Sequence, residues 1–440
     1  MNTSSPFQLI LLGVFGLLGA GGVLFFALGG GLGGATEVVG PVLIWGTLDA
    51  APFEQVISGM AEDDRRLAQV AYERHDARNF YSELANAIAS DRGPDLILIS
   101  HEYLVQHSDK LLAIPYESLP RRTFEESFVD QGSLFLNEQG VLGIPIALDP
   151  LVMYWNKDMI AAAGYALAPQ YWDELFTLAE RITKRDDANN IQKSVIAFGE
   201  YQNVAHAKDI LAALILQAGG EITYQDSQGR IVPSLASTNA EKTQQPAQSA
   251  LRFYTEFANP SKSKTYSWNR SLPNSRDAFA AGDVALYIGF ASELNLLRSQ
   301  NPNLNLGVAP IPQIRGGGKT VTYGEMQAFA IPRGSLNPAG ARLVSFVLAA
   351  ATPSQVLASV RGTPSPNRQA LADNAASSTA STADAVFREA ALISRGWYDP
   401  NPLRTEQVFR GMIEGVTSGA LRLGDAILEG DKALLELVSQ

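Results

Sequence analysis

Short apolar runs alternate with amphipathic stretches along the chain after Pro41. In order, this pattern predicts a strand at 42–46, a helix at 51–63, a strand at 67–72, a helix at 79–89 and a strand at 95–100. The last run, DLILIS, is apolar at successive positions, which is typical of a strand buried on both faces. Strands and helices that alternate in this way predict an α/β fold whose mainly parallel sheet is covered on both sides.

The next segments indicate a crossing and then a second lobe. The apolar run VLGIPIAL at 141–148 contains a proline, so we expect an edge strand or a crossing segment there. Helices are predicted at 171–182 and 207–218. Polar or small residues dominate 239–248 and 372–385, which predicts surface loops or weak helices.

The N-terminus follows a different pattern. Between Phe7 and Leu32 only Gln8 is strongly polar, and the run is long enough to cross a bilayer. No Lys or Arg precedes it and no clear A-x-A site follows, so we expect a retained transmembrane anchor at 7–32 and a tether at 33–41. A cleaved signal segment is the alternative.

Composition narrows the function. With 440 residues, of which 46% are hydrophobic, the chain exceeds what one core usually covers, so two lobes are expected. A net charge of −11 without a basic run argues against nucleic acid as a partner. The absence of cysteine excludes disulfides, thiolate metal sites and a lipid-modified cysteine. No cofactor, metal site or catalytic residue is predicted.

Several motifs occur in an order that is found in one family. They are GPDLILISHEYL, LLAI, GVLGIPIALDPLVMYWNKDMI, PQYWDELFTLAERIT, DAFAAGDVALYIGF, NLGVAPIPQ and AFAIPRGSLNPAGARLVSFVL. From about Val42 to the C-terminus, the chain resembles family 1 of the extracellular solute-binding proteins. These are substrate-binding proteins of ABC transporters, and the resemblance is to their maltodextrin-binding-protein-like branch.

The resemblance implies a type II periplasmic-binding-protein-like fold behind one N-terminal transmembrane helix. Two α/β lobes would be joined by crossing strands, with the ligand bound between them. We expect 42–148 plus about 291–348 to form lobe one, and 149–290 plus about 349–440 to form lobe two. The crossings would lie near 147–149, 288–292 and 349–352.

Candidate ligand-binding residues in lobe one follow strand ends, because the crevice of a parallel sheet lies beyond its carboxyl edge. Asp49 offers a carboxylate for sugar hydroxyls and Trp45 offers an aromatic face, although a helix cap and a packed tryptophan are the alternatives. His101 and Glu102 follow the third strand. By the resemblance Glu102 occupies an acidic ligand position, whereas His101 has a structural alternative.

Four further candidates lie later in the chain: Asp149, Phe290, Tyr323 and Trp397. The resemblance matches Asp149 to a ligand-binding acid, and the alternative is a turn aspartate before Pro150. Phe290 and Trp397 are aromatic platforms that could equally pack within a lobe. Tyr323 lies in a region that approaches the ligand in the family.

The resemblance also has departures, because Ile99 and Glu406 stand where the maltodextrin branch has tryptophans. We therefore expect a small polar solute, with a sugar other than maltodextrin favoured and a sugar phosphate or polyamine left open. The expected function is delivery of this solute to an ABC permease by lobe closure. A tethered sensory receptor and, with less support, a carbohydrate-active enzyme are the alternatives. We expect a monomer on the extracytoplasmic face of the cell membrane, or a secreted or periplasmic protein if the N-terminus is cleaved.

Overall fold

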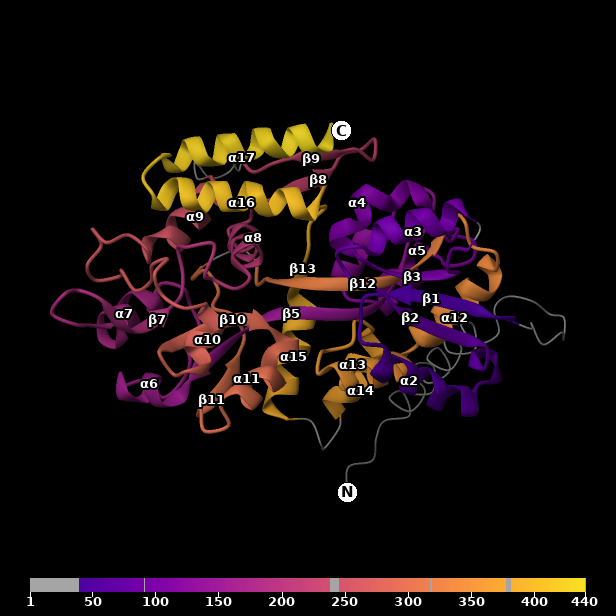
Figure 1. Cartoon of the computed structure of the whole chain (residues 1–440), viewed down its shortest axis with the longest axis horizontal. Helices are drawn as coiled ribbons and strands as arrows, with labels where there is room; N and C mark the ends of the chain where they lie inside the picture. The colour runs from indigo at the N-terminus through magenta and orange to yellow at the C-terminus, as the bar shows by residue number, and fades with distance from the viewer. Residues whose placement is uncertain (1–38, 91, 238–244, 317–318, 377–380, 440) are drawn as a thin grey trace, which may run out of the picture.

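The computed structural model describes residues 39–440 apart from 91, 238–244, 317–318, 377–380 and 440. The predicted anchor at 7–32 and most of the tether lie outside the described residues. Two lobes lie side by side, and β5 (Ile144–Asn156) and β12 (Thr322–Pro332) run between them (Figure 1). Among the residues that the structure describes, no single helix has the length and apolar composition needed to span a bilayer. The helices α12 (Pro338–Leu348) and α13 (Ala351–Arg361) have this length and composition only when they are taken together, and they are bent by 72° relative to each other.

Lobe one is the half built around three parallel strands, β1 (Val42–Gly46), β2 (Val70–Arg74) and β3 (Leu96–Ser100). Antiparallel β12 and the first half of β5 extend this sheet in the order β2-β1-β3-β12-β5, and the two-residue strands β4 (Leu111–Leu112) and β13 (Ser394–Arg395) pair with β12. The helices of this lobe are α2 (Ala50–Asp63), α3 (Phe80–Ala89), α4 (Leu104–His107), α5 (Arg121–Ser127), α12, α13 and α14 (Arg368–Ala376). The strands and helices predicted between 42 and 100 are thus confirmed, with boundaries shifted by up to three residues.

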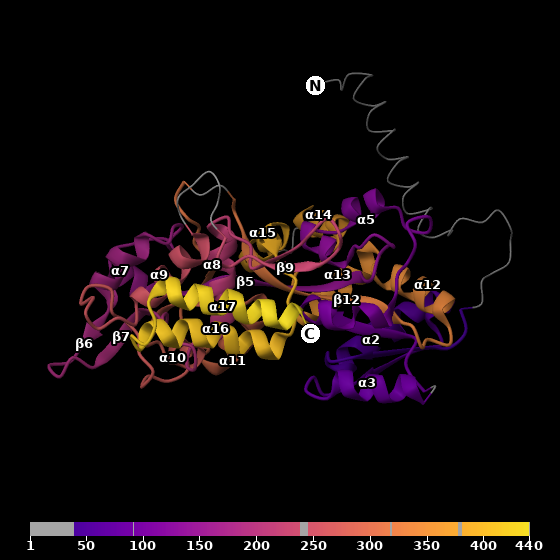
Figure 2. The ribbon, with the colours of Figure 1, turned by 90° about the horizontal axis from the view of Figure 1, so that it is seen from above.

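Lobe two is built on the second half of β5. The sheet continues from β5 through β10 (Val284–Phe290) and β7 (Ile191–Ile196) to β6 (Lys184–Arg185), while β11 (Leu306–Ala309) also pairs with β5. The helices are α6 (Lys157–Ala162), α7 (Glu174–Ile182), α8 (Ala207–Gln217), α9 (Pro246–Glu256), α10 (Ser275–Ala280), α11 (Leu294–Gln300), α16 (Pro402–Thr417) and α17 (Leu423–Val438), with a small hairpin of β8 (Thr223–Gln225) and β9 (Ile231–Pro233). Figures 1 and 2 show α16 and α17 side by side along this lobe.

β5 is the strand that both lobes share. It pairs with β12 as far as Pro150 and with β10 from Leu151 onward. Pro150 has no N–H to donate, which fits the point where the strand changes partner. The proline-containing run is therefore a crossing segment, close to the predicted crossing at 147–149.

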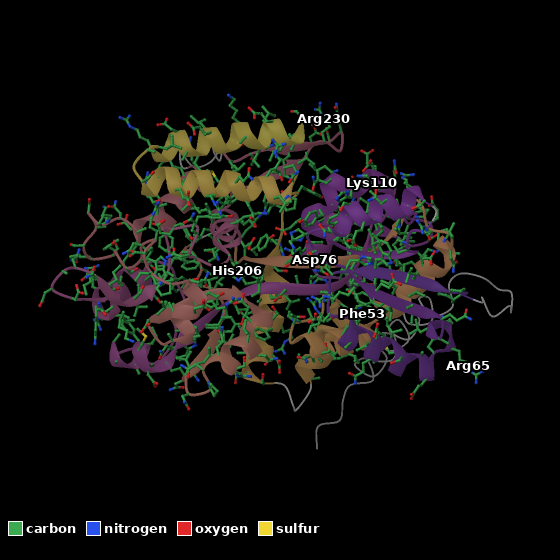
Figure 3. The ribbon with its side chains drawn as sticks, in the orientation of Figure 1. Phe53, Arg65, Asp76, Lys110, His206 and Arg230 are labelled. Carbon is green, nitrogen blue, oxygen red and sulfur yellow. The ribbon has the colours of Figure 1, made fainter. Side chains whose placement is uncertain are left out.

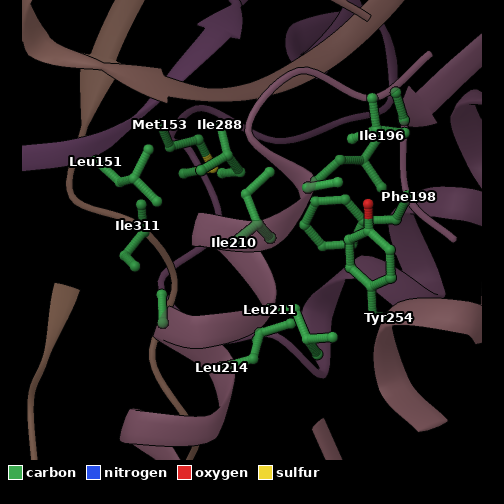
Figure 4. Packing of buried hydrophobic residues seen from close by; sticks show 14 of the residues in the cluster. Leu151, Met153, Ile196, Phe198, Ile210, Leu211, Leu214, Tyr254, Ile288 and Ile311 are labelled. Carbon is green, nitrogen blue, oxygen red and sulfur yellow. The ribbon is translucent and has the colours of Figure 1, made fainter. Parts of the chain in front are cut away.

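The apolar cores explain why these strands consist of successive apolar residues. In lobe one, Leu96 and Leu98 pack on one face of the sheet, whereas Ile97 and Ile99 pack on the other. Successive apolar residues are needed because strand side chains alternate between faces. Lobe two has one large cluster, in which residues of β5 and α8 interdigitate (Figure 4). Trp172 belongs to it and donates its indole N–H to Gln217 at 2.6 Å, so this residue of the motif serves packing.

The predicted lobe boundaries need two corrections. Leu294 and Ile311 pack in the cluster of lobe two, although 291–348 was assigned to lobe one. The reason is that β11 pairs with β5 before β12 returns to lobe one. Conversely, Leu357 and Leu371 pack in lobe one, although 349–440 was assigned to lobe two.

The later crossings therefore lie elsewhere than at 288–292 and 349–352. On β12, Tyr323 belongs to the cluster of lobe two and Met326 to a cluster of lobe one. On α15 (Thr382–Ile393), Phe387 packs in lobe two and Ala391 in lobe one. These two elements, together with β5, connect the lobes.

Candidate ligand-binding cleft

A cavity of about 320 Å³ lies between the lobes, with side chains from both in its wall. From lobe one and the crossing strand β12 come Glu102, Tyr103, Tyr323 and Glu325; from lobe two come Tyr201, Val204, His206, Ala207, Lys208, Asp209, Phe290, Pro402, Leu403 and Glu406. The residues cluster after β3, after β10 and at the first turns of α8 and α16. Strand ends and helix starts thus converge, as expected for the crevice of an α/β protein.

Lys208 joins the two sides of the cleft. Its ammonium donates to Glu102 of lobe one at 3.2 Å and to Asp399 of lobe two at 2.7 Å. The side chain is only 7% exposed, and Nζ lies 5.6 Å from the centre of the Trp397 ring. Burial alone would lower the pKa of Lys208, but the charges of Glu102 and Asp399 outweigh it and raise that pKa above its ordinary value. Lys208 is therefore an ammonium at every relevant pH.

Glu102 is the carboxylate of the cleft whose negative charge is most strongly stabilised by its neighbours. Burial opposes its charge, but the charge of Lys208 and the hydroxyl of Tyr323 hold the pKa of Glu102 below its usual range. The Tyr323 hydroxyl donates to Glu102 at 3.0 Å. Burial raises the pKa of Tyr323 well above 10, so the hydroxyl keeps its proton.

Asp209 and Glu325 are carboxyl groups of the cleft that have few hydrogen bonds or ion pairs to stabilise a negative charge. Burial, reinforced by the negative charge of Glu102, raises the pKa of Asp209 to about 7 and that of Glu325 to about 7. The one ion-pair contact of Asp209 among the described residues is His206 Nδ1 at 3.9 Å. Glu325 receives a single long hydrogen bond of 3.4 Å, from Gln327. Near neutral pH these groups exchange protons readily.

His206, labelled in Figure 3, opens α8 with a left-handed backbone, φ 60°. Its Nε2 lies 2.5 Å from Glu293, which also accepts from the Tyr287 hydroxyl at 2.6 Å. Burial lowers the pKa of His206, but the hydrogen bond and the charge of Glu293 exceed this effect, so the net shift is upward. The Phe290 ring packs edge-on against the imidazole at 4.7 Å, which fixes an aromatic face in the cleft wall.

Of the residues predicted from the sequence, Glu102, Phe290 and Tyr323 line the cleft. Asp49 and Trp45 do not. The Asp49 side chain is 75% exposed and pairs with Arg74 at 3.0 Å. Trp45 is buried in the core of lobe one, with its ring 4.0 Å from that of His75. The alternative weighed for Trp45, a packed tryptophan, describes its position, whereas Asp49 occupies the N-cap position of α2 without making a side-chain capping hydrogen bond.

The other three predicted residues lie behind the wall. His101 is buried, accepts from the Met326 amide at 3.3 Å and is neutral, because burial lowers its pKa to about 4. Asp149 is buried and accepts from the Ser292 amide at 3.1 Å, with a pKa that burial raises. Trp397 packs with Phe409 in lobe two beneath Lys208. Each supports a lining residue or a crossing strand.

The sequence analysis missed most of the lobe-two wall, including Tyr201, Lys208 and Asp209. A signal was present, because HAKD at 206–209 places three polar residues at the start of the otherwise apolar helix that continues ILAALILQ. Polar residues grouped at the first turn of a buried helix are expected to face a cleft. In the described part of the chain, no group of three or more His, Asp or Glu side chains is arranged to hold a metal ion.

Two α/β lobes, joined by shared strands and enclosing a cleft, define a periplasmic-binding-protein-like protein. The chain matches the family model of the bacterial extracellular solute-binding proteins over residues 69–352. It belongs to this family, as the ordered motifs indicated. Curated binding-protein relatives from Brucella abortus and Brucella suis are 24% identical over 263 residues; the match spans 58% of this chain and 58% of theirs, so the chain covers little more than half their length.

Solved structures share the fold at low identity. A cyclo/maltodextrin-binding protein complexed with maltotetraose superimposes with a TM-score of 0.72 at 16% identity, covering 92% of this chain and 98% of that chain. A cyclic α-maltosyl-1,6-maltose binding protein from Arthrobacter globiformis gives 0.72 at 14% identity, covering 91% and 99%. A solute-binding protein from Thermotoga lettingae bound with α-D-tagatose gives 0.66 at 20% identity, covering 90% and 99%.

Proposed function

We propose that this protein binds a carbohydrate outside the cytoplasm and delivers it to an ABC importer by closing its lobes. The observation that carries this proposal is the composition of the cleft wall, to which both lobes contribute. A ligand that touches both lobes binds the closed form better than the open one, and therefore shifts the population toward closure. No bond in the ligand has to break.

The chemistry of the wall suits a small sugar. Phenol and phenyl rings of Tyr103, Tyr201 and Phe290 offer faces for apolar sugar surfaces. Carboxyl groups of Asp209 and Glu325, half protonated near pH 7, both donate to and accept from hydroxyl groups. A cavity of about 320 Å³ is at the small end of ligand sites, which run from about 300 to 1,000 Å³, and favours a mono- or disaccharide.

Similar structures support the assignment to carbohydrates, since the proteins named above are described with maltotetraose and with α-D-tagatose. The family is described as extracellular, which fits a protein held at the outer face of the membrane through 7–32. Its partners would be a sugar and a membrane permease, and we expect a monomer. Asp49, Trp45, His101, Asp149 and Trp397 would then act through packing or hydrogen bonds, whereas Glu102, Phe290 and Tyr323 would contact the ligand.

Thermal unfolding of the full-length chain with a panel of mono- and disaccharides tests the binding. A ligand that binds only the native state adds about 2.7 kcal/mol of stability at a concentration of 100 Kd. We expect a saturable rise in Tm with at least one sugar, and recovery of that sugar unchanged by mass analysis. A sugar that is cleaved would point to an enzyme, and the absence of a shift with every sugar would contradict the proposal.

Lobe closure can be tested with spin labels attached to cysteines. Because the chain has no cysteine of its own, only the introduced cysteines would be labelled. Lys110 of lobe one and Arg230 of lobe two are exposed and lie on the same side of the molecule (Figure 3). Spin labels on K110C and R230C should approach each other when the sugar is added. A matched pair within lobe two, R230C with K264C, should keep its distance. An unchanged distance in both pairs would argue against closure.

A further inference from the structure

We infer that the carbohydrate carries a protonated amine, held between Asp209 of lobe two and Glu325 on the crossing strand β12. This inference rests on the proposed function and names the chemical class of its ligand. Four carboxyl groups line the cleft: Glu102, Asp209, Glu325 and Glu406. Among the residues in this wall, Lys208 is the single lysine or arginine.

The basic side chains in the wall already have partners. The ammonium of Lys208 forms ion pairs with the carboxylates of Glu102 and Asp399, at N–O distances of 3.2 and 2.7 Å. The Nε2 atom of His206 lies 2.5 Å from the Glu293 carboxylate, whereas its Nδ1 atom lies 3.9 Å from the Asp209 carboxylate. Glu325 makes no ion pair with any residue in the described ranges, and its one hydrogen bond measures 3.4 Å. Glu406 is exposed to solvent, so among the three carboxyl groups of the wall that are not exposed, Asp209 and Glu325 are those whose charge the protein compensates least.

A buried carboxyl group without a counter-charge is costly as an anion, so it takes up a proton instead. Asp209 and Glu325 follow this rule, each with a pKa raised by burial and by the charge of Glu102. Glu102, Asp209 and Glu325 line the same cavity, and the charge of Glu102 acts on both of the other two. An ammonium placed there would provide the missing charge and would bind oxygens on both sides of the cleft.

Other charged ligands fit less well. The positive ends of α8 and α16 could attract an anion, but Asp209 occupies the first turn of α8, and Asp399 accepts hydrogen bonds from Asn401 and Thr405 at the start of α16. A metal ion lacks a ligand set, because no suitable group of three side chains occurs in the described ranges. An organic cation with hydroxyl groups matches both the carboxyl groups and the aromatic rings of the wall.

Binding of an ammonium should displace protons, which separates it from binding of a neutral sugar. The groups that act on Asp209 are Glu102, Lys208, His206 and Glu406. Those that act on Glu325 are Glu102, Asp149, Gln327 and Arg361. Between pH 5.5 and 7 both carboxyl groups lose protons while an amine with a pKa of about 8 stays largely protonated, so the affinity for the amine should increase. A neutral analogue should gain little from the same change.

The test is calorimetry of the full-length chain with amino sugars and their N-acetyl counterparts at pH 5.5 and 7. Suitable pairs are glucosamine and its β-1,4-linked dimer against N-acetylglucosamine and N,N′-diacetylchitobiose, and galactosamine against N-acetylgalactosamine. We expect the amine to bind at least about tenfold tighter in one pair at pH 7, with a smaller preference at pH 5.5. D209N and E325Q should each remove most of that preference, while D49N, which changes an exposed carboxylate outside the cleft, should preserve it.

The outcomes separate this inference from the proposed function. If N-acetyl or unmodified sugars bind as tightly as their amines, the inference is wrong and the carbohydrate function stands. If putrescine binds and no sugar does, the carbohydrate function is wrong. If calcium chloride alone binds and D209N abolishes it, the site is for a metal and the inference fails. If none of these probes binds, the inference is wrong, and the carbohydrate function is decided by the panel of mono- and disaccharides.

Discussion

Lys208 on α8 and Glu102 just after β3 form an ion pair of 3.2 Å that joins the two lobes across the cleft. The two residues are 106 positions apart in the chain. The same ammonium bonds Asp399 behind the wall at 2.7 Å. The pair therefore links the position of the lobes to the electrostatics of the site, because opening the cleft would separate Glu102 from its counter-charge.

Replacing Lys208 by methionine should destabilise the protein strongly. Glu102 and Asp399 would remain buried without their shared cation, and removing one partner of a buried pair typically costs about 3–5 kcal/mol. Urea unfolding of K208M at pH 7 measures this loss. The matched control is K193M, since Lys193 pairs with Asp283 at 2.7 Å but is 41% exposed. That exposed pair should be worth at most about 1 kcal/mol. Equal losses of unfolding free energy in K208M and K193M would show that the buried ion pairs of Lys208 stabilise the fold no more than the exposed pair of Lys193 does.

Replacing Glu102 by glutamine should affect closure more than stability. Lys208 keeps Asp399 in E102Q, so the core of lobe two retains its compensated charge. The link to lobe one is weakened, because the amide has no charge to hold the ammonium. Without ligand, the distance between labels on K110C and R230C should broaden toward longer values in this variant. A distribution identical to that of the parent would mean that the ion pair does not hold the lobes together.

The stability of the unliganded protein should fall as pH rises from about 4 to 8. The pKa values of Asp209 and Glu325 are raised from 3.8 and 4.5 to about 7. Between these limits the folded state binds more protons than the unfolded state, so the free energy of unfolding decreases with pH. His206 acts in the same direction, because its raised pKa gives a contribution that is present at low pH and lost as pH rises. For Asp209 the effect amounts to at most about 4 kcal/mol.

Thermal unfolding of the parent, D209N and E325Q between pH 4 and 8 tests this dependence. Both variants should flatten the curve, since an amide has no proton to lose. His101 acts oppositely below pH 6.5: its pKa of about 4 means that the unfolded state binds its proton first, so stability falls with acidification. A parent protein that gains stability steadily from pH 5 to 8 would contradict the assignment of buried, protonated carboxyl groups.

The local pattern was sufficient for the first three strands and the first two helices of lobe one. DLILIS could be recognised as doubly buried because its successive apolar residues have to serve two faces, and the strand observed is 96–100. The later crossings could not be located from the pattern. Their positions depend on β11 pairing with β5, and this pairing joins segments about 150 residues apart. The apolar side chains of β12 and α15 that pack in one lobe do not differ in kind from those that pack in the other, so the pattern does not mark where either element passes between the lobes.

Site residues were harder to predict than strands, because a cleft is made by elements that are distant in sequence. Asp49 and Asp209 both lie at the start of a helix, and the sequence does not distinguish them. What distinguishes them is the neighbour that folding brings close. Asp49 is exposed and pairs with Arg74, whereas the charges of Glu102, Lys208 and His206 act on Asp209.

The contrast between these two aspartates gives a decisive prediction. D49A removes an exposed pair worth at most about 1 kcal/mol, so it should change neither the stability by more than that nor the affinity for the ligand by more than about twofold. D209A removes a carboxyl group from the cleft wall and should weaken binding at least about tenfold. Calorimetry with the same sugar on both variants makes the comparison, and thermal unfolding checks that each variant is folded. If D49A weakened binding and D209A did not, the ligand would lie against β1 and α2, as the resemblance to the maltodextrin branch implies, and the cleft described here would not be the site.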